Sequence, residues 1–387
     1  MIPRLRHLRR VEALLDASPV VALLGARQVG KSTLARDIAR RRGGRAAFFD
    51  LEDVRDADRL ATAPLSTLEP LQGLVVIDEV QRVPELFQAL RVLADRRPVR
   101  TRFLVLGSAS PHLLRQSSES LAGRIAFHEL PGFGLDEVRS GALDRLWMRG
   151  GFPRAFLASS DAESLRWRLD FIRTFLERDV AELGAAVPPA SLRRFWAMVA
   201  RSHGATWNAS GLGRSLGVSD ATTRRWLDLL SGAYVLRVLQ PWHENLSKRQ
   251  VKAPKVYVGD SGLLHALLGV ATAEELDVHP QVGASWEGFG IDRVIERLGA
   301  RADQCHFWRT QAGAELDLLV VAGRRRLGFE FKRTDTPSTL TRSMHVAAED
   351  LRLDRLDIVH PGRDTYELRK GFRALALRRV LEDLEPL

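Results

Sequence analysis

The stretch from Gly25 to Ser32, GARQVGKS, constrains the fold of this chain more than any other feature. It fits the pattern G-x-x-x-x-G-K-[ST], in which the glycines let the backbone curl so that its N–H groups face phosphate. An apolar run, Pro19–Gly25, precedes it, and the helical run KSTLARDIARRR follows it. Such a loop works between a strand and a helix, because the positive N-terminal end of the helix also faces the phosphate. The sequence therefore predicts a nucleotide-binding α/β domain.

The same loop predicts how ATP and Mg²⁺ are held. Lys31 is expected to reach the β and γ phosphate oxygens, and the hydroxyl of Ser32 is expected to ligate Mg²⁺. The predicted cofactors are therefore ATP and Mg²⁺. The predicted nucleotide-binding residues are Gly25, Ala26, Arg27, Gln28, Val29, Gly30, Lys31, Ser32 and Thr33.

Polar side chains also follow two later apolar runs. LVVIDE ends with Asp78 and Glu79. Asp78 is expected to hold Mg²⁺ through water, and Glu79 to orient and polarise the water that attacks the γ-phosphate. Ser108 ends the next apolar run, where a side chain can sense the γ-phosphate. The alternative for Ser108 is a turn serine that caps a helix.

The spacing of apolar runs predicts the rest of this domain. Strands are expected over 46–51, 73–80, 101–110 and 125–130, with helices over 84–97 and 111–124 between them. Apolar strands that alternate with helices predict a parallel sheet covered on both faces. After it, 150–156 is expected to form a loop bend, and 161–200 to form helices with apolar stripes.

The segment from Ala209 to Leu239 predicts a winged helix-turn-helix, with a tight turn at Gly217 and a second helix capped by Ser219. The start of that helix would enter a DNA major groove, and the basic hairpin after it would face phosphate. The predicted DNA contacts are Thr222, Thr223, Arg224 and Arg225 on the helix, and Lys248, Arg249, Lys252 and Lys255 on the hairpin. The alternative is a module that packs against its neighbours as a lid or clamp.

The net charge of +10 favours a polyanionic partner, and DNA is the first candidate. Arginine is abundant and lysine scarce, so a genome biased toward arginine codons is the alternative explanation for this charge.

The tail carries an acidic residue and a Glu-x-Lys unit. Residues two apart on a strand share a face, so Glu330 and Lys332 converge, and a hairpin brings Asp317 beside them. These two carboxylates are expected to bind Mg²⁺, with Glu287 as a third ligand and Lys332 positioning water. The alternative is a set of carboxylates that pair with the abundant arginines.

The motifs GARQVGKST, LVVIDEVQ, VLGSAS, SLAGR and GGFPRAF resemble the AAA+ superfamily, and within it a prokaryotic group of ATPases of uncharacterised function. In that superfamily an arginine just before the fifth strand acts on the γ-phosphate of a neighbouring subunit. Arg124 occupies this place, so the resemblance implies a catalytic Arg124 and a homo-oligomer. The alternative for Arg124 is a salt bridge within its own domain.

The tail motifs SWEGF, FWRTQAGAELDLLV and FEFKR resemble the PD-(D/E)XK restriction-endonuclease-like superfamily. That resemblance implies a nuclease site made of Glu287, Asp317, Glu330 and Lys332, and hence a metal-dependent deoxyribonuclease.

These features together predict an α/β chain in four parts. They are a P-loop AAA+ core at 1–140, a helical lid or linker at 141–203, a winged helix-turn-helix at 204–262 and a PD-(D/E)XK-like domain at 282–387. The predicted function is Mg²⁺-dependent ATP hydrolysis that acts on or with DNA. The alternative is an ATP-dependent conformational switch whose nuclease-like domain is inactive.

The compartment is predicted from two absences in the sequence. A single cysteine, Cys305, permits no internal disulfide, and no apolar run reaches the roughly 18 residues needed to cross a bilayer. We therefore expect a cytoplasmic protein without a membrane partner.

Overall fold

The computed structural model describes residues 2–108, 121–138, 140–182, 187–243 and 250–387. Contacts divide the chain into two units, Met1–Gly132 with Leu229–Val235, and Phe133–Asp228 with Leu236–Leu387. Most of the helix predicted over 111–124 lies outside the described residues.

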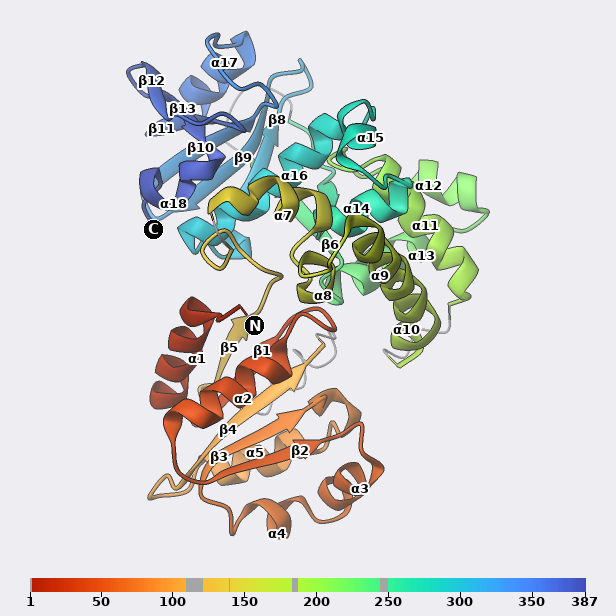
Figure 1. Cartoon of the computed structure of the whole chain (residues 1–387), viewed down its shortest axis with the longest axis vertical. Coiled ribbons are helices and arrows are strands. Elements are labelled where there is room, and N and C mark those ends of the chain that lie inside the picture. Colours follow the sequence, from red (N-terminus) through yellow and green to blue (C-terminus); the bar gives the residue numbers. More distant parts are fainter. Residues whose placement is uncertain (1, 109–120, 139, 183–186, 244–249) are drawn as a thin grey trace. The chain divides into compact units, whose positions relative to one another are not determined.

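The first unit is built on a five-stranded sheet in the order β2-β3-β4-β1-β5 (Figure 1). Every pairing in it is parallel, which confirms the prediction from alternating apolar runs and helices. The strands are β1 (Val20–Leu24), β2 (Ala46–Asp50), β3 (Gly73–Asp78), β4 (Thr101–Gly107) and β5 (Ile125–Glu129).

Helices cover both faces of this sheet (Figure 1). One face carries α1 (Leu5–Ala17) and α2 (Lys31–Arg42), and the other carries α3 (Val54–Thr62), α4 (Pro64–Leu68) and α5 (Leu86–Ala94). Every residue of β1 is buried, as expected of a strand that helices cover on both sides. The helix predicted to start at Pro84 begins at Leu86 instead.

The second unit contains an eight-stranded mixed sheet in the order β12-β13-β11-β10-β9-β8-β6-β7. Helix α17 packs on one side of the sheet, against β9 and β11, while α16 packs on β10 and α18 on β13. The strands predicted over the tail are present. The bounds are β6 (Leu236–Pro241), β7 (Lys255–Val258), β8 (Cys305–Arg309), β9 (Glu315–Ala322), β10 (Arg325–Phe331), β11 (Arg355–His360), β12 (Tyr366–Arg369), β13 (Phe372–Ala376), α16 (Val282–Leu298), α17 (Arg342–Asp350) and α18 (Val380–Asp383).

The helices of the second unit pack around α14 (Ser261–Leu268), which contacts α7, α9 and α11. Most of α14 is buried, including Leu263, Leu264 and His265. The expected loop bend at 150–156 contains the short helix α8 (Pro153–Phe156), because proline fits the first turn of a helix. The others are α7 (Leu143–Arg149), α9 (Asp161–Thr174), a π-helical turn (Phe175–Asp179), α10 (Val180–Glu182), α11 (Pro189–Arg201) and α15 (Ala273–Asp277).

The two helices predicted for the helix-turn-helix are present as α12 (Ala209–Leu216) and α13 (Asp220–Gly232). Gly217 takes a left-handed φ of 70° in the turn, and Ser219 Oγ accepts from the backbone N–H of Thr222 at 3.2 Å. The predicted turn and cap are therefore confirmed.

The strand after the helix-turn-helix belongs to the large sheet. β6 pairs antiparallel with β7 and also parallel with β8, through Gln240 beside His306 and Pro241 beside Phe307. The strands on either side of the predicted basic hairpin, β6 and β7, therefore continue the sheet of the C-terminal region. Among the described helices, none combines the length and the apolar character that a bilayer span requires.

Candidate nucleotide site and carboxylate cluster

The glycines of the phosphate loop take conformations that larger residues avoid. Gly25 leaves β1 with a φ of +153°, and a Cβ there would lie 2.4 Å from the carbonyl oxygen of Leu130. Gly30 caps α2 with a φ of 105°. Only glycine tolerates these positive φ values and this close approach of the backbone, so the loop can lead directly into the helix.

Lys31 lies inside this loop. Its residue is only 5% exposed, and Nζ donates to the carbonyl oxygens of Gly25 at 2.9 Å and Ala26 at 3.0 Å. Burial lowers the pKa of Lys31, and the carboxylates of Glu79 and Asp78 oppose that shift. The ammonium group is therefore held by backbone oxygens next to the position predicted for phosphate.

Ser32 and Asp78 meet at the end of the sheet. The Ser32 hydroxyl, on the first turn of α2, donates to Asp78 Oδ2 at 2.5 Å from the end of β3. Burial raises the pKa of Asp78, and the hydrogen bond from Ser32 works against that rise. A hydroxyl and a carboxylate are oxygen ligands of the kind that Mg²⁺ prefers, so these residues fit the predicted ion.

Glu79 is held in a rare backbone conformation beside Ser108. Its φ of 54° and ψ of 44° are left-handed, which costs a residue other than glycine about 1–3 kcal/mol and is found mainly at functional sites. Ser108 Oγ donates to Glu79 Oε2 at 3.2 Å. The structure thus brings together the residues predicted to orient water and to sense phosphate.

Gln81 is a site residue that the sequence did not identify. Its Nε2 donates to Glu79 Oε2 and, at 3.2 Å, to Ser108 Oγ. The 3₁₀ turn Val80–Arg82 returns this side chain toward the strand end. Its place two residues after Glu79 was the available signal.

Two arginines brace the loop. Arg27 Nη2 donates to Glu52 Oε1 at 2.7 Å. Arg4, which is buried, donates to the carbonyl oxygens of Val29 at 3.3 Å and Pro131 at 2.9 Å. The partners of Arg4 are so distant in sequence that no local pattern could have revealed its role.

Arg124 forms an ion pair within its own unit. Its guanidinium holds both carboxylate oxygens of Asp95, with Nε–Oδ1 at 2.5 Å and Nη2–Oδ2 at 3.0 Å. Arg124 precedes β5, so it lies at the amino end of the parallel strands, opposite the phosphate loop. The alternative stated for Arg124 is therefore the arrangement observed.

The predicted DNA contacts on α13 divide into two groups. Arg224 and Arg225 are exposed and Thr222 is half-buried, whereas Thr223 is fully buried. Thr223 Oγ1 donates to the carbonyl oxygen of Asp220 at 2.8 Å, so its prediction as a DNA contact is wrong. Its side chain faces the core because it lies on the inner side of the helix. Lys248 and Arg249 lie outside the described residues.

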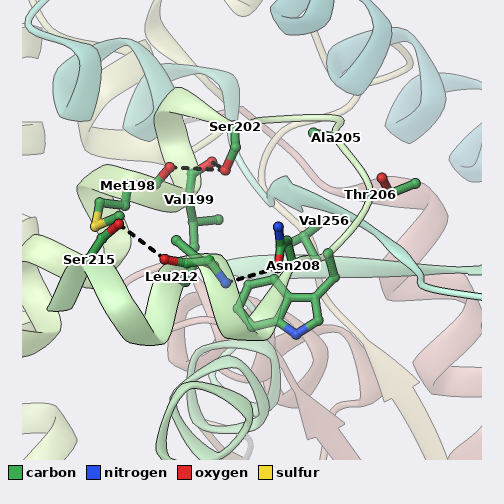
Figure 2. A pocket seen from close by; sticks show the side chains of 11 residues that line it. Met198, Val199, Ser202, Ala205, Thr206, Asn208, Leu212, Ser215 and Val256 are labelled. Atoms are coloured by element: carbon green, nitrogen blue, oxygen red, sulfur yellow. Dashed lines mark hydrogen bonds between the residues drawn. The ribbon is translucent and has the colours of Figure 1, made fainter. Parts of the chain in front are cut away.

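A pocket of about 300 Å³ lies between α11 and α12, and Figure 2 shows the side chains around it. The hydroxyl of Ser202 donates to the Met198 carbonyl at 3.0 Å, and that of Ser215 to the Gly211 carbonyl at 3.0 Å (Figure 2). These two hydroxyls therefore form hydrogen bonds to the backbone of their own helices. Val256 of β7 also lines the pocket. Side chains alternate along a strand, so its neighbours Lys255 and Tyr257 face the other way.

The β9–β10 hairpin brings Asp317 beside the Glu-x-Lys unit, as predicted. Leu318 pairs with Phe329, so the next step of the register sets Asp317 opposite Glu330. The backbone N–H of Phe331 donates to Asp317 Oδ2 at 3.0 Å, and Lys332 Nζ lies 2.8 Å from Glu330 Oε1.

Lys255 contradicts its prediction as a phosphate contact. The residue is only 3% exposed, and its Nζ lies among carboxylates rather than in solvent. The distances are 3.0 Å to Glu287 Oε1, 2.6 Å to Glu315 Oε1 and 3.6 Å to Asp317 Oδ1. The ammonium turns inward because it can neutralise these acidic groups there. We call Lys255, Glu287, Glu315, Asp317 and Glu330 the carboxylate cluster.

Burial and neighbouring negative charge raise the pKa values of two acids of this cluster. Burial, followed by the charge of Asp317, raises the pKa of Glu287 and of Glu330 above the usual range, each to about 7. Lys255 and the hydroxyl of Tyr257, which donates to Glu287 Oε1 at 2.6 Å, oppose the rise at Glu287.

The cluster does not fit a divalent metal ion as it is arranged. Within the described part of the chain, no three of its carboxylates place one oxygen each within 4.8 Å of one another. The space between Glu287, Glu315 and Asp317 is already crossed by the Lys255 ammonium. The geometry favours the alternative in which the carboxylates pair with basic side chains. The main partner is Lys255 and not an arginine.

Comparisons with known proteins identify a domain and the family of this chain. Residues 17–139 match a family model described as an AAA domain. Uncharacterized protein Rv2008c of Mycobacterium tuberculosis is 47% identical over 381 residues, which are 98% of this chain and 85% of that protein. The chain belongs to the family of this mycobacterial protein. Uncharacterized protein Mb2031c of Mycobacterium bovis, with the same identity and coverage, is a second member.

Two other segments of this chain match family models that are described without a function. Residues 140–274 and 282–380 match models described as domains of unknown function, DUF8612 and DUF4143. The AAA match, the sheet order and the phosphate loop together identify the first unit as an AAA-type P-loop ATPase domain.

Two solved structures show the extent of likeness in fold. A Walker-type ATPase of Pyrococcus abyssi shares 16% identity at a TM-score of 0.49, over 69% of this chain and 96% of that one. The RuvB Holliday junction branch migration motor of Thermotoga maritima shares 16% identity at a TM-score of 0.32, over 61% of this chain and 89% of that one. Likeness at these levels transfers no substrate or partner.

Proposed function

We propose that this protein hydrolyses ATP with Mg²⁺ at the phosphate loop of its first unit. The observation that carries the proposal is the convergence of Lys31, Ser32, Asp78 and Glu79 at one end of the sheet. Asp78 Oδ1 also accepts from the backbone N–H of Glu79 at 3.0 Å, which ties the acidic pair together. A protein that only binds ATP has no need of Glu79.

Each side chain has a separate task in this proposal. The glycine-rich loop turns its N–H groups to the phosphates, and Lys31 offsets their negative charge. Ser32 and Asp78 would hold Mg²⁺, which when bound would offset the charge that develops on the phosphoryl oxygens. Glu79 accepts a proton from the attacking water, and Gln81 and Ser108 fix the direction of its carboxylate.

The proposal is tested by the release of phosphate from ATP. Wild type is expected to release phosphate with Mg²⁺ and to stop when the metal is chelated. Asp78→Asn is expected to slow release by more than about tenfold, because it removes a negative charge from the predicted Mg²⁺ site while keeping an acceptor for Ser32. The control is Asp58→Asn on the exposed face of α3. Turnover in Asp78→Asn as fast as in Asp58→Asn would refute the assignment.

DNA is a candidate partner in addition to ATP, and the exposed arginines of α13 favour it. Arg224 and Arg225 lie in the N-terminal half of α13, the second helix after the turn at Gly217. In helix-turn-helix proteins the N-terminal end of the second helix enters the major groove. The net charge of +10 supplies a general attraction to a polyanion. We propose that DNA binds here without the hairpin lysine Lys255, which is buried elsewhere.

Reversing both charges, Arg224→Glu with Arg225→Glu, is expected to weaken binding of duplex DNA. The slope of log affinity on log salt should become shallower by about 1 for each DNA phosphate that the protein no longer neutralises. The matched control reverses Arg193 and Arg194, an exposed pair on α11, and so changes the net charge equally. Equal losses of affinity in the two double variants would show only a general charge effect and would exclude α13 as the DNA-binding helix.

A further inference from the structure

The carboxylate cluster contains a cation supplied by the chain. Lys255 is almost fully buried and lies within ion-pair distance of Glu287, Glu315 and Asp317. Glu315 is also 3.4 Å from Arg309, and Glu330 is 2.8 Å from Lys332. Of these basic groups Lys255 is the most buried, since the side chains of Arg309 and Lys332 are 41% and 43% exposed.

Strand β7 is built to deliver this lysine. Lys255 and Tyr257 stand on the same face of β7, and both donate to the same atom, Glu287 Oε1. Glu287 comes from α16, while Glu315 and Asp317 come from β9. The Lys255 ammonium therefore joins three elements, as a structural metal ion does in other proteins.

One polar atom of the cluster is left without a partner. Glu330 is 7% exposed, and among the described residues its Oε2 has no hydrogen-bond partner, although Oε1 accepts from Lys332. A buried carboxylate oxygen without a donor is costly, and either a hydrogen-bond donor or a cation would lower that cost.

We propose that the Lys255 ammonium is the resident cation of the carboxylate cluster and excludes divalent metal ions from it, so that removing this ammonium creates a site for hard divalent cations. The loss of one positive charge would leave Glu287, Glu315 and Asp317 facing one another without a shared counter-ion. Carboxylate oxygens in that arrangement are the ligands that Mg²⁺, Mn²⁺ and Ca²⁺ take. This inference does not depend on ATP turnover.

The experiment titrates terbium, a hard cation, into the full-length chain and measures luminescence sensitised by tryptophan. All tryptophans of the sequence lie outside Met1–Gly132 and Leu229–Val235, so every sensitising side chain belongs to the second unit. Lys255→Met removes the charge and keeps the apolar stem. It is expected to bind terbium at least about tenfold more tightly than wild type. Mg²⁺ or Mn²⁺ should compete for the site.

Two control variants locate the site. Lys370→Met, at an exposed lysine, is expected to behave as wild type. Adding Asp317→Asn to Lys255→Met is expected to abolish the gain, because it removes one of the carboxylates. Equal terbium affinity in wild type and Lys255→Met would overturn the proposal, and so would a gain that survives Asp317→Asn.

Thermal unfolding gives a second readout that does not depend on terbium luminescence. Wild type is expected to melt at the same temperature with Mn²⁺ or with a chelator. Lys255→Met is expected to melt lower in chelator and to recover with Mn²⁺, because metal binding stabilises the folded state. A melting temperature of Lys255→Met that is the same in Mn²⁺ and in chelator would contradict a latent metal site.

Discussion

Replacing Glu79 with glutamine is expected to slow ATP turnover by about 10²- to 10³-fold while ATP still binds. The substitution keeps the size of the side chain and an oxygen that can accept from Gln81 and Ser108, so the local hydrogen bonds can persist. What it removes is the ability to take a proton from water. The rate of phosphate release at saturating ATP measures the loss.

The control for this substitution is Glu85→Gln, an identical change at an exposed residue just before α5. It is expected to turn ATP over at the wild-type rate. If Glu79→Gln and Glu85→Gln release phosphate equally fast, the carboxylate at Glu79 has no part in the reaction. If both match a negligible wild-type rate, the protein is a nucleotide-dependent switch.

Replacing Lys31 with methionine is expected to weaken ATP binding by about 10- to 100-fold, the size of a lost charge-assisted hydrogen bond. The ammonium is the one described cation donating to the carbonyls of Gly25 and Ala26 inside the loop. Methionine keeps the buried stem but offers no charge to phosphate. Calorimetric titration of MgATP, with a thermal melt to show that the variant is folded, measures the effect.

Lys370→Met serves as the matched control, because Lys370 is an exposed lysine of the second unit. Its affinity for ATP is expected to equal that of wild type. A folded Lys31→Met protein that binds MgATP as tightly as this control would contradict the place given to Lys31.

The grouping of the candidate nucleotide-site residues could be predicted because they are contiguous or end neighbouring strands. The phosphate loop lies within Gly25–Ser32, and Asp78 and Glu79 directly follow one apolar run. Strands of a parallel sheet end at a common edge, so the meeting of Ser32 with Asp78 follows from the pattern. The β9–β10 hairpin was predictable for a similar reason, since a short basic turn fixes its register.

The remaining features depend on partners far apart in the sequence. A lysine in a basic stretch usually stays in solvent, and nothing near Lys255 indicates that Glu287 and Glu315 will surround it. The partner of Arg124, Asp95, was equally unmarked. Thr223 was misassigned because its neighbours at the start of α13 are exposed, whereas one side of every packed helix must face inward.

The identity of the nucleotide that stays on the protein tests the central claim most directly. Wild type and Glu79→Gln are incubated with MgATP, separated rapidly from free nucleotide and denatured, and the released nucleotide is identified. Hydrolysis driven by Glu79 predicts ADP from wild type and ATP from Glu79→Gln. ATP recovered intact from both proteins, or ADP recovered equally from both, would contradict it.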